Sequence, residues 1–326
     1  MNEAIQADAI VRRFGEVDAI KGINLSVKSG EIYGFLGPNG AGKSTAVRIL
    51  TTLLLPSSGS VVIQGLDAIK EPQRVKLVIG AALQELSLDP KQTGRELLTL
   101  QGRLYGLSRK DIKRRIDELI PLIDIGDALD RLTVTYSGGM KRRLDLAASM
   151  IHEPEVLFLD EPTTGLDPAS RQKIWDQVRS INRDSGVTVF LTTQYLEEAD
   201  VLAERISIID EGVIVVEGTP EQLKHSVGAD IIVVHIKAED AAKAQSVAAA
   251  IEGVENVENY TDEIAISVSD GSTMIGKVAL ALNAAGVGMD QILLRTPTLD
   301  DVFLKYTGAR LDARQEQQST EEAAAA

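Results

Sequence analysis

The sequence has no cysteine, few aromatic residues and no excess of positive charge. The lack of cysteine excludes disulfides and thiolate metal sites. Lysine and arginine together number 34 against 48 aspartates and glutamates, which gives a net charge of −14. Because a general nucleic-acid-binding protein carries a basic surface, this balance argues against nucleic acid as a partner.

Long hydrophobic runs are also missing. No stretch approaches the roughly 18 consecutive apolar residues of a membrane-spanning helix, and residues 1–12 lack the apolar core of a signal peptide. We therefore expect a cytoplasmic protein. If it works at the inner face of the cell membrane, a separate chain must provide the membrane span.

The residues that are present are sufficient for a substantial core. The chain has 326 residues and is 44% hydrophobic, which suits one large domain and a smaller one. The three histidines, His152, His225 and His235, do not have the spacing of a metal site. The single tryptophan, Trp175, lies on a predicted helix without polar neighbours, and we expect it only to pack.

One nine-residue stretch organises the rest of the chain. It matches the phosphate-binding pattern G-x-x-x-x-G-K-[ST] and reads Gly37, Pro38, Asn39, Gly40, Ala41, Gly42, Lys43, Ser44 and Thr45. An apolar strand pattern over 32–36 precedes it and a helical pattern over 46–50 follows. Backbone N–H groups and the helix N-terminus then favour a polyphosphate. We expect Lys43 to reach the β- and γ-phosphates and Ser44 to hold Mg²⁺.

A second acidic site follows another apolar run. Residues 156–159 are continuously apolar, which is typical of a buried parallel strand, and they end in Asp160 and Glu161. We expect Asp160 to hold Mg²⁺ and Glu161 to orient and deprotonate an attacking water. Taken alone, the pair could also be two acids at an exposed strand end.

Several other positions have more than one reading. Ser137, Gly138 and Gly139 are a helix N-cap with a turn, or a second anion-binding helix start. Gln84 is an ordinary polar strand end on its own. Phe14 could stack on a nucleotide base, but a phenylalanine is more often a buried core residue.

Helical periodicity predicts an insertion within the α/β core at about 92–136. Two apolar stripes define it: Leu97, Leu98, Leu100 and Leu104 form the first, and Ile112, Ile116, Leu119 and Ile120 form the second.

The composition changes near 227. Residues 230–295 follow a βαββαβ pattern, a helix is expected over 299–306, and the polar, alanine-rich tail is expected to be disordered. The predicted domains are therefore 1–227, 228–310 and a tail at 311–326.

Taken together, the motifs resemble the ATP-binding subunit of an ABC transporter, over 5–224. Residues 37–45 resemble Walker A, Gln84 the Q-loop glutamine, 137–140 the ABC signature, 156–161 Walker B and 165–167 the D-loop. The resemblance implies a phosphate-loop, RecA-like α/β fold with antiparallel β and α-helical subdomains, followed here by a small C-terminal α+β domain.

The resemblance also implies a site and partners. It places Lys43, Gln84, Glu161 and Gln194 in catalysis, and Mg²⁺ on Ser44, Gln84 and Asp160. Two ATP molecules would lie between the subunits of a head-to-tail homodimer, each on one chain's Walker A and on the other chain's Ser137, Gly138 and Gly139. Phe14 would stack on adenine, and Asp167 would lie near the nucleotide. A separate integral-membrane permease would dock on the helical insertion.

The chain departs from the family pattern at three positions. The signature has Tyr136 where leucine is usual and Met140 where glutamine is usual, and the switch position has Gln194 where most relatives have histidine. A glutamine amide donates a hydrogen bond but carries no proton. We therefore predict slower hydrolysis than in a histidine form, or a stronger reliance on Glu161.

The switch glutamine, the signature and the ending at 298–304 narrow the resemblance to daunorubicin-resistance-type drug exporters, whose ATPases have a similar C-terminal extension. Two alternatives remain open. One is a soluble ABC ATPase that acts on DNA ends or ribosomes, although the single cassette leaves no room for a long coiled coil between Lys43 and Ser137. The other is a nucleotide-dependent regulator without productive hydrolysis. We expect the C-terminal domain to strengthen dimer contact or tune the cycle.

Overall fold

The computed structural model describes residues 3–84, 88–260 and 263–308. It divides into two compact units, residues 1–220 and 221–310. The predicted boundary was at 227, whereas the structure groups 221–227 with the C-terminal unit. In that unit Leu223 is buried and Lys305 Nζ donates a hydrogen bond to the Ser226 carbonyl. The predicted tail at 311–326 lies outside the described residues.

A six-stranded sheet forms the centre of the N-terminal unit. Its strand order is β10-β9-β3-β8-β7-β6, and every neighbouring pair is parallel except β9 and β10. The strands are β3 (Ile32–Leu36), β6 (Ile79–Ala82), β7 (Val156–Asp160), β8 (Thr188–Thr193), β9 (Arg205–Asp210) and β10 (Val213–Gly218). Strands β3, β7 and β8 are buried throughout, and for β3 and β7 the apolar runs over 32–36 and 156–159 predicted this.

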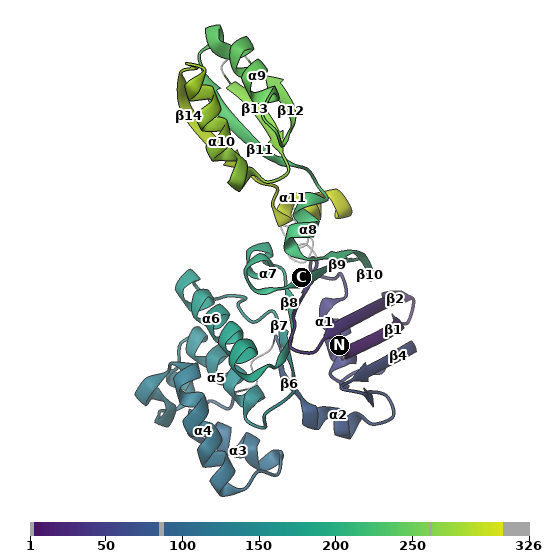
Figure 1. Ribbon diagram of the computed structural model, residues 1–326. Helices are drawn as coiled ribbons and strands as arrows, with labels where there is room; N and C mark the ends of the chain where they lie inside the picture. The colour runs from purple at the N-terminus through teal and green to yellow at the C-terminus, as the bar shows by residue number, and fades with distance from the viewer. Residues whose placement is uncertain (1–2, 85–87, 261–262, 309–326) are drawn as a thin grey trace, which may run out of the picture. The chain divides into compact units, whose positions relative to one another are not determined.

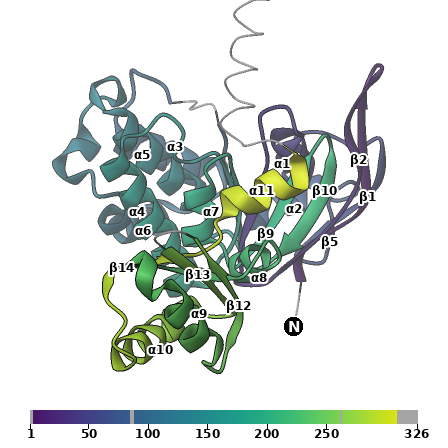
Figure 2. The same cartoon turned by 90° about the horizontal axis from the view of Figure 1, so that it is seen from above.

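An antiparallel sheet lies on one side of the central sheet (Figures 1 and 2). Its order is β2-β1-β4-β5, and the strands are β1 (Glu3–Phe14), β2 (Val17–Lys28), β4 (Ser58–Ile63) and β5 (Leu66–Asp67). Helix α1 (Lys43–Leu50) shares one apolar core with both sheets. Helix α2 (Pro72–Val78), which the sequence did not reveal, leads directly into β6.

Helices cover the other face of the central sheet (Figure 1). They are α3 (Gly94–Leu104), α4 (Arg109–Ile123), α5 (Gly138–Met150) and α6 (Pro168–Ser185), with 3₁₀ turns at Gly126–Asp130 and Thr133–Thr135. Helix α7 (Leu196–Leu202) follows β8. Side chains cap α3, α4, α5 and α6 at their starts, and Thr93 forms a capping box with Glu96.

The predicted apolar stripe on α3 is partly wrong. Leu97 and Leu98 are buried, but Leu100 is 41% and Leu104 is 71% exposed. The buried face of α3 instead follows Gly94, Leu98 and Gly102, spaced four residues apart. A Cβ at Gly102 would lie 2.7 Å from Ile112 Cγ1, so these glycines let α3 approach its neighbours closely.

The C-terminal unit has the predicted βαββαβ order. Its sheet runs β12-β13-β11-β14 with antiparallel neighbours, which is a split-βαβ arrangement. The elements are β11 (Asp230–Ile236), α9 (Ala241–Ala249), β12 (Val254–Asn259), β13 (Glu263–Val268), α10 (Gly271–Ala284) and β14 (Met289–Arg295). Helices α9 and α10 each bury one apolar face against the sheet. Helices α8 (Pro220–His225) and α11 (Leu299–Thr307) complete the unit.

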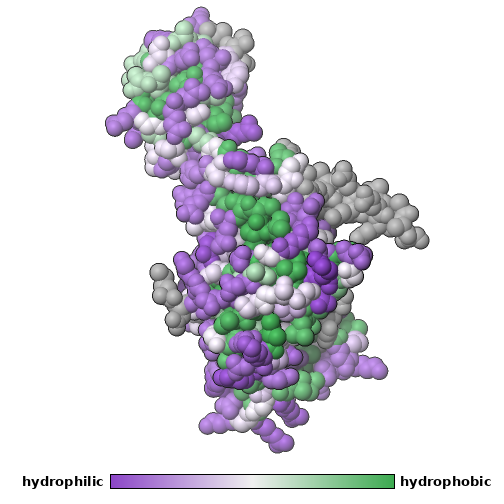
Figure 3. All heavy atoms as spheres, turned by 90° about the vertical axis from the view of Figure 1, so that its right-hand side faces the viewer, coloured by the Kyte–Doolittle hydropathy of each residue, from purple (hydrophilic) through white to green (hydrophobic). Residues whose placement is uncertain are grey.

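No helix among the described residues combines the length and the apolar character needed to cross a bilayer. Figure 3 shows hydrophilic side chains over much of one face of the molecule, with hydrophobic residues gathered in patches between them.

Candidate active site

The phosphate-loop sequence connects β3 to the start of α1, and two of its glycines are required by the surroundings. A Cβ at Gly37 would lie 2.4 Å from the Ile209 carbonyl oxygen. Gly42 has a φ of +109°, and a Cβ there would lie 2.7 Å from the Ala19 carbonyl oxygen. Glycine therefore lets the loop pack against strands β2 and β9, and helix α1 begins directly after it at Lys43.

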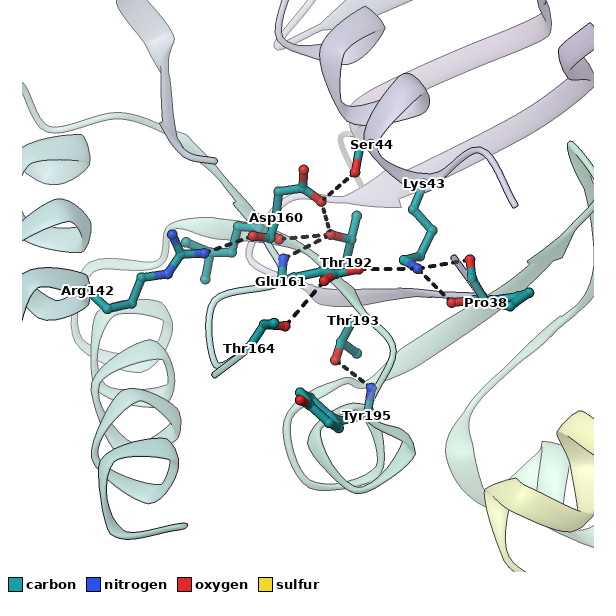
Figure 4. Close-up of polar contacts among 12 residues, drawn as sticks. Pro38, Lys43, Ser44, Arg142, Asp160, Glu161, Thr164, Thr192, Thr193 and Tyr195 are labelled. Carbon is teal, nitrogen blue, oxygen red and sulfur yellow. Dashed lines mark hydrogen bonds and ion pairs between the residues drawn. The ribbon is translucent and has the colours of Figure 1, made fainter. Parts of the chain in front are cut away.

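Lys43 is buried and turned back toward its own loop (Figure 4). Its Nζ donates hydrogen bonds to the carbonyl oxygens of Gly37 at 2.7 Å and Pro38 at 3.1 Å, and it lies 3.3 Å from Glu161 Oε1. Burial lowers the pKa of Lys43, and the carboxylates of Glu161 and Asp160 oppose that effect. The ammonium group thus has an anionic partner that a phosphate oxygen could replace.

Glu161 has an unusual backbone conformation. Its φ is +49°, in the left-handed region, which costs a non-glycine residue roughly 1–3 kcal/mol. The turn is held because the Glu161 N–H donates to the Thr192 carbonyl oxygen at 3.0 Å and Thr192 Oγ1 at 3.1 Å. Thr164 Oγ1 donates to Glu161 Oε2 at 3.2 Å. These contacts fix the carboxylate at the end of β7, beside Lys43.

Asp160 and Ser44 face each other. Ser44 Oγ lies 3.5 Å from Asp160 Oδ1, which also accepts a hydrogen bond from Thr192 Oγ1 at 2.5 Å (Figure 4). A hydroxyl and a carboxylate suit Mg²⁺, which usually binds through one or two protein ligands, substrate phosphates and waters. Among the described residues, no group of three or more histidine, cysteine, aspartate or glutamate side chains could hold a metal ion.

Sheet register brings Gln84 and Gln194 to the same edge. Ala82 pairs with Leu159 in neighbouring parallel strands. Gln84 and Glu161 each come two residues later, so both follow the same edge of the sheet. Leu36 pairs with Thr193, so Gln194 stands level with Gly37. The Thr193 hydroxyl accepts the Tyr195 N–H at 2.9 Å and shapes the turn that carries Gln194. Gln84 is exposed and Gln194 is half-buried.

The signature residues lie away from the phosphate loop in the same chain. Ser137 is the N-cap of α5 and accepts the Met140 N–H at 3.3 Å. Ser137 and Gly138 are exposed, whereas a Cβ at Gly139 would lie 2.9 Å from Ser170 Oγ. Helices α5 and α1 belong to the separate cores on the two faces of the central sheet. The N-cap reading of Ser137 is confirmed, and its anion-binding reading stays a prediction.

Asp167 and Phe14 complete the predicted set. Asp167 is the N-cap of α6 and accepts hydrogen bonds from the Ser170 N–H at 3.0 Å and Ser170 Oγ at 2.7 Å, which lowers the pKa of Asp167. Phe14 is 45% exposed at the end of β1, so it is not a core residue. The guanidinium carbon of Arg12 lies 4.4 Å from the centre of its ring.

Two features of the site were missed by the sequence. Trp175 has a polar partner after all, because its Nε1 donates to Glu198 Oε1 at 3.0 Å. Glu198 is fully buried, and burial raises its pKa. Arg142 is buried beside Asp160 and donates to three backbone carbonyls. The sequence carries no signal for either residue, because Arg142 lies between Lys141 and Arg143, and Glu198 follows Glu197.

Comparison with known proteins agrees with this geometry. Residues 20–164 match the family model described as ABC transporter, and residues 218–307 match the C-terminal domain of DrrA1-3-like ATP-binding proteins. The chain is 46% identical over 311 residues to the daunorubicin resistance ATP-binding protein DrrA2 of Streptomyces coeruleorubidus, covering 95% of this chain and 96% of that protein. It is 34% identical over 312 residues to the linearmycin resistance ATP-binding protein LnrL of Bacillus subtilis, covering 94% and 99%.

A solved structure matches the cassette. The dimeric post-hydrolysis state of the ATP-binding cassette MJ0796, bound to ADP and Pi, aligns with a TM-score of 0.60 and 25% identity, covering 66% of this chain and 98% of that one. The predicted fold class and ATPase activity are therefore confirmed. The chain belongs to the ATP-binding proteins of ABC transporters, in the daunorubicin-resistance branch, and is an ABC-type ATPase.

Proposed function

We propose that this chain is the ATP-hydrolysing subunit of an ABC exporter and powers efflux of a drug-like or lipid-like compound through a separate membrane permease. The cluster of Lys43, Asp160 and Glu161 supports hydrolysis, since it joins a phosphate-binding cation to a carboxylate base within 3.3 Å. The matching relatives are named for resistance to two different compounds, daunorubicin and linearmycin. Their names therefore support efflux as a class and leave the cargo of this chain open.

In the proposed hydrolysis Lys43 and Glu161 act in sequence. A γ-phosphate competes for the Lys43 ammonium, which frees Glu161 Oε1 from its ion pair to accept a proton from the attacking water. Ser44 and Asp160 would hold Mg²⁺, which neutralises phosphate charge when bound. The Gln194 amide donates a hydrogen bond to the γ-phosphate, and Gln84 lines the same edge.

The active assembly that we propose is a head-to-tail homodimer with ATP between the copies. Ser137 and Gly138 are exposed at the start of α5, on the face of the central sheet opposite to α1. A second copy could therefore supply them to the phosphate that one copy binds. The matched MJ0796 cassette is itself dimeric, and this supports the assembly.

We propose that the permease docks on a groove in the N-terminal unit. A cavity of about 260 Å³ is lined by residues that follow α1 and by residues of α2, β6, α3 and α5, including Leu53, Tyr105 and Asp145. Three leucines here are exposed: Leu53 at 55%, Leu77 at 59% and Leu104 at 71%. Leu53 lines the cavity, and the other two are next in the chain to the lining residues Lys76 and Tyr105. A short helix with an apolar face would cover these leucines, and docking would place the protein on the inner face of the membrane.

The proposal is tested by mutation of the base. Glu161→Gln should lower ATP turnover by about 100-fold or more, because the amide cannot accept the proton. It should also accumulate as a dimer in excess MgATP, measured by light scattering. Glu197→Gln changes an exposed glutamate in the first turn of α7 and serves as the control. A Glu161→Gln protein that stays monomeric with MgATP and its permease present would overturn the dimer.

The permease is tested separately. Pulldown of the full chain from a detergent extract should recover a multispanning membrane protein, encoded in a neighbouring reading frame. Recovery of nucleic acid or ribosomes instead would favour the soluble alternative.

A further inference from the structure

We propose that Arg142 is a positioning residue for hydrolysis and that Asp145 connects it to the docking groove. In this proposal a basic side chain on the permease helix pairs with Asp145. The pairing changes the strength of the hydrogen bonds that Arg142 donates to the carbonyl oxygens around Glu161. The part that concerns the permease rests on the proposed function, whereas the positioning role of Arg142 can be tested without it.

Arg142 joins the ends of two neighbouring strands. From α5 its Nε donates to the Pro162 carbonyl oxygen at 2.9 Å, and its two terminal nitrogens donate to the carbonyl oxygens of Leu83 at 2.6 Å and Asp160 at 2.8 Å. Figure 4 shows the side chain reaching from its helix to the Asp160 segment. The side chain is buried, so these bonds are shielded from water and strengthened.

The three carbonyls flank the reacting groups. Pro162 and Asp160 stand on either side of Glu161, and Leu83 directly precedes Gln84. The guanidinium is a rigid planar fork, so it fixes the spacing between the two strand ends. A displacement of about 1 Å at a catalytic group is sufficient to lower turnover by about 100-fold. Arg142 can therefore set the activity without touching nucleotide.

Asp145 lies one helical turn beyond Arg142. Its Oδ2 is 3.5 Å from an Arg142 terminal nitrogen, the one that also holds the Leu83 carbonyl. This oxygen is buried and has no hydrogen-bond partner among the described residues. Asp145 also lines the groove, together with Gln101, Tyr105 and Lys76. A carboxylate with spare acceptor capacity, in a groove that the exposed Leu53 also lines, fits an apolar helix that carries a lysine or arginine.

An occupant would act through the charge of Asp145. A cation bound there competes for the carboxylate that Arg142 shares, so Arg142 directs more of its hydrogen bonding to the strand-end carbonyls. The path from the groove to Glu161 then consists of two side chains in direct contact, Asp145 and Arg142.

The positioning role is tested on the full chain alone. Arg142→Lys keeps the charge but offers a single point donor, and we expect kcat to fall about 100-fold with the KM for ATP within about twofold. Lys141→Gln on the same helix is the control. If kcat/KM falls only in proportion to the fraction of protein that is folded, the role of Arg142 is merely structural and the proposal is wrong. An unchanged kcat would also overturn the proposal.

The link to the groove is tested with the co-purified membrane protein in lipid vesicles. Asp145→Asn should lose most of the ATPase stimulation that the membrane protein gives, whereas the exposed Asp176→Asn should keep it. A basic-to-acidic change on the partner helix combined with Asp145→Lys should restore part of it. Wild type without stimulation would count against the proposed function, and stimulation of Asp145→Asn equal to wild type would overturn the link alone.

Discussion

At the scale of single residues, the switch position tests whether a hydrogen-bond donor alone is sufficient for hydrolysis or whether a proton and positive charge there add to the rate. Gln194→His introduces a side chain that can carry a proton and a positive charge, which glutamine cannot. We expect steady-state ATP turnover to rise about threefold to tenfold, in the range of one added charge-assisted hydrogen bond. A phosphate-release assay measures it, and an unchanged turnover would show that Gln194 does not limit the rate.

Asp145 gives the fold a defined pH dependence. Burial raises the pKa of Asp145 to about 6, and the nearby Arg142 opposes this. The folded chain therefore holds this proton more tightly than the unfolded chain, in which an aspartate has a pKa of about 3.9. Stability falls as pH rises between these two values, and the full penalty, at most about 3 kcal/mol, remains above pH 6.

Asp145→Asn cannot ionise, so it tests the sign of this effect. We expect its melting temperature to exceed that of wild type at pH 8 and to match it near pH 4. Thermal unfolding followed by circular dichroism measures the difference, with Asp176→Asn as the exposed control. A variant that is less stable than wild type at pH 8 would show that ionised Asp145 stabilises the fold.

Much of the site could be predicted because its motifs are local. A strand, a glycine loop and a helix follow one another over 32–50, so the sequence alone predicted the local structure that carries Lys43 and Ser44. Arg142 could not be found in this way. The carbonyls that it binds are 59, 18 and 20 residues away, and only the folded chain brings them together.

At the scale of the element, α3 shows how glycines can outweigh leucines. Periodicity assigned Leu100 and Leu104 to the core, but close packing along Gly94, Leu98 and Gly102 rotates them toward solvent. A periodicity argument considers only where the apolar side chains lie. It does not take into account that a helix can pack more closely where a glycine has no Cβ. The same rotation leaves Leu104 beside the proposed docking groove.

The packing of α3 can be tested at Gly102. Gly102→Ala places a Cβ 2.7 Å from Ile112 Cγ1, so we expect a loss of about 1–3 kcal/mol from overpacking. Gly276→Ala, in α10, is the matched control. No atom lies within 4 Å of the added Cβ there, so alanine should stabilise its unit by about 0.5–1 kcal/mol. Denaturant unfolding that gives both variants the same sign would contradict the packing account.

At the scale of the whole molecule, the C-terminal unit has a complete core of its own. It was predicted to strengthen dimer contact or to tune the cycle. Truncation before Glu221 should therefore weaken ATP-dependent dimerisation of the Glu161→Gln chain while leaving nucleotide affinity within about twofold. Light scattering and nucleotide titration separate these two readouts, and a truncated chain that dimerises and hydrolyses like wild type would contradict both roles.

The chain contains one tryptophan, and its indole is hydrogen-bonded to Glu198 on the helix that follows the Gln194 turn. The fluorescence of Trp175 should therefore report conformational changes of that turn without an added dye. We expect MgATP to shift the fluorescence of the Glu161→Gln chain, and Trp175→Phe to abolish the tryptophan signal. Since cysteine is absent, a second probe can be attached anywhere through one introduced thiol, so the motions of nucleotide site and groove can be timed against each other in a single sample.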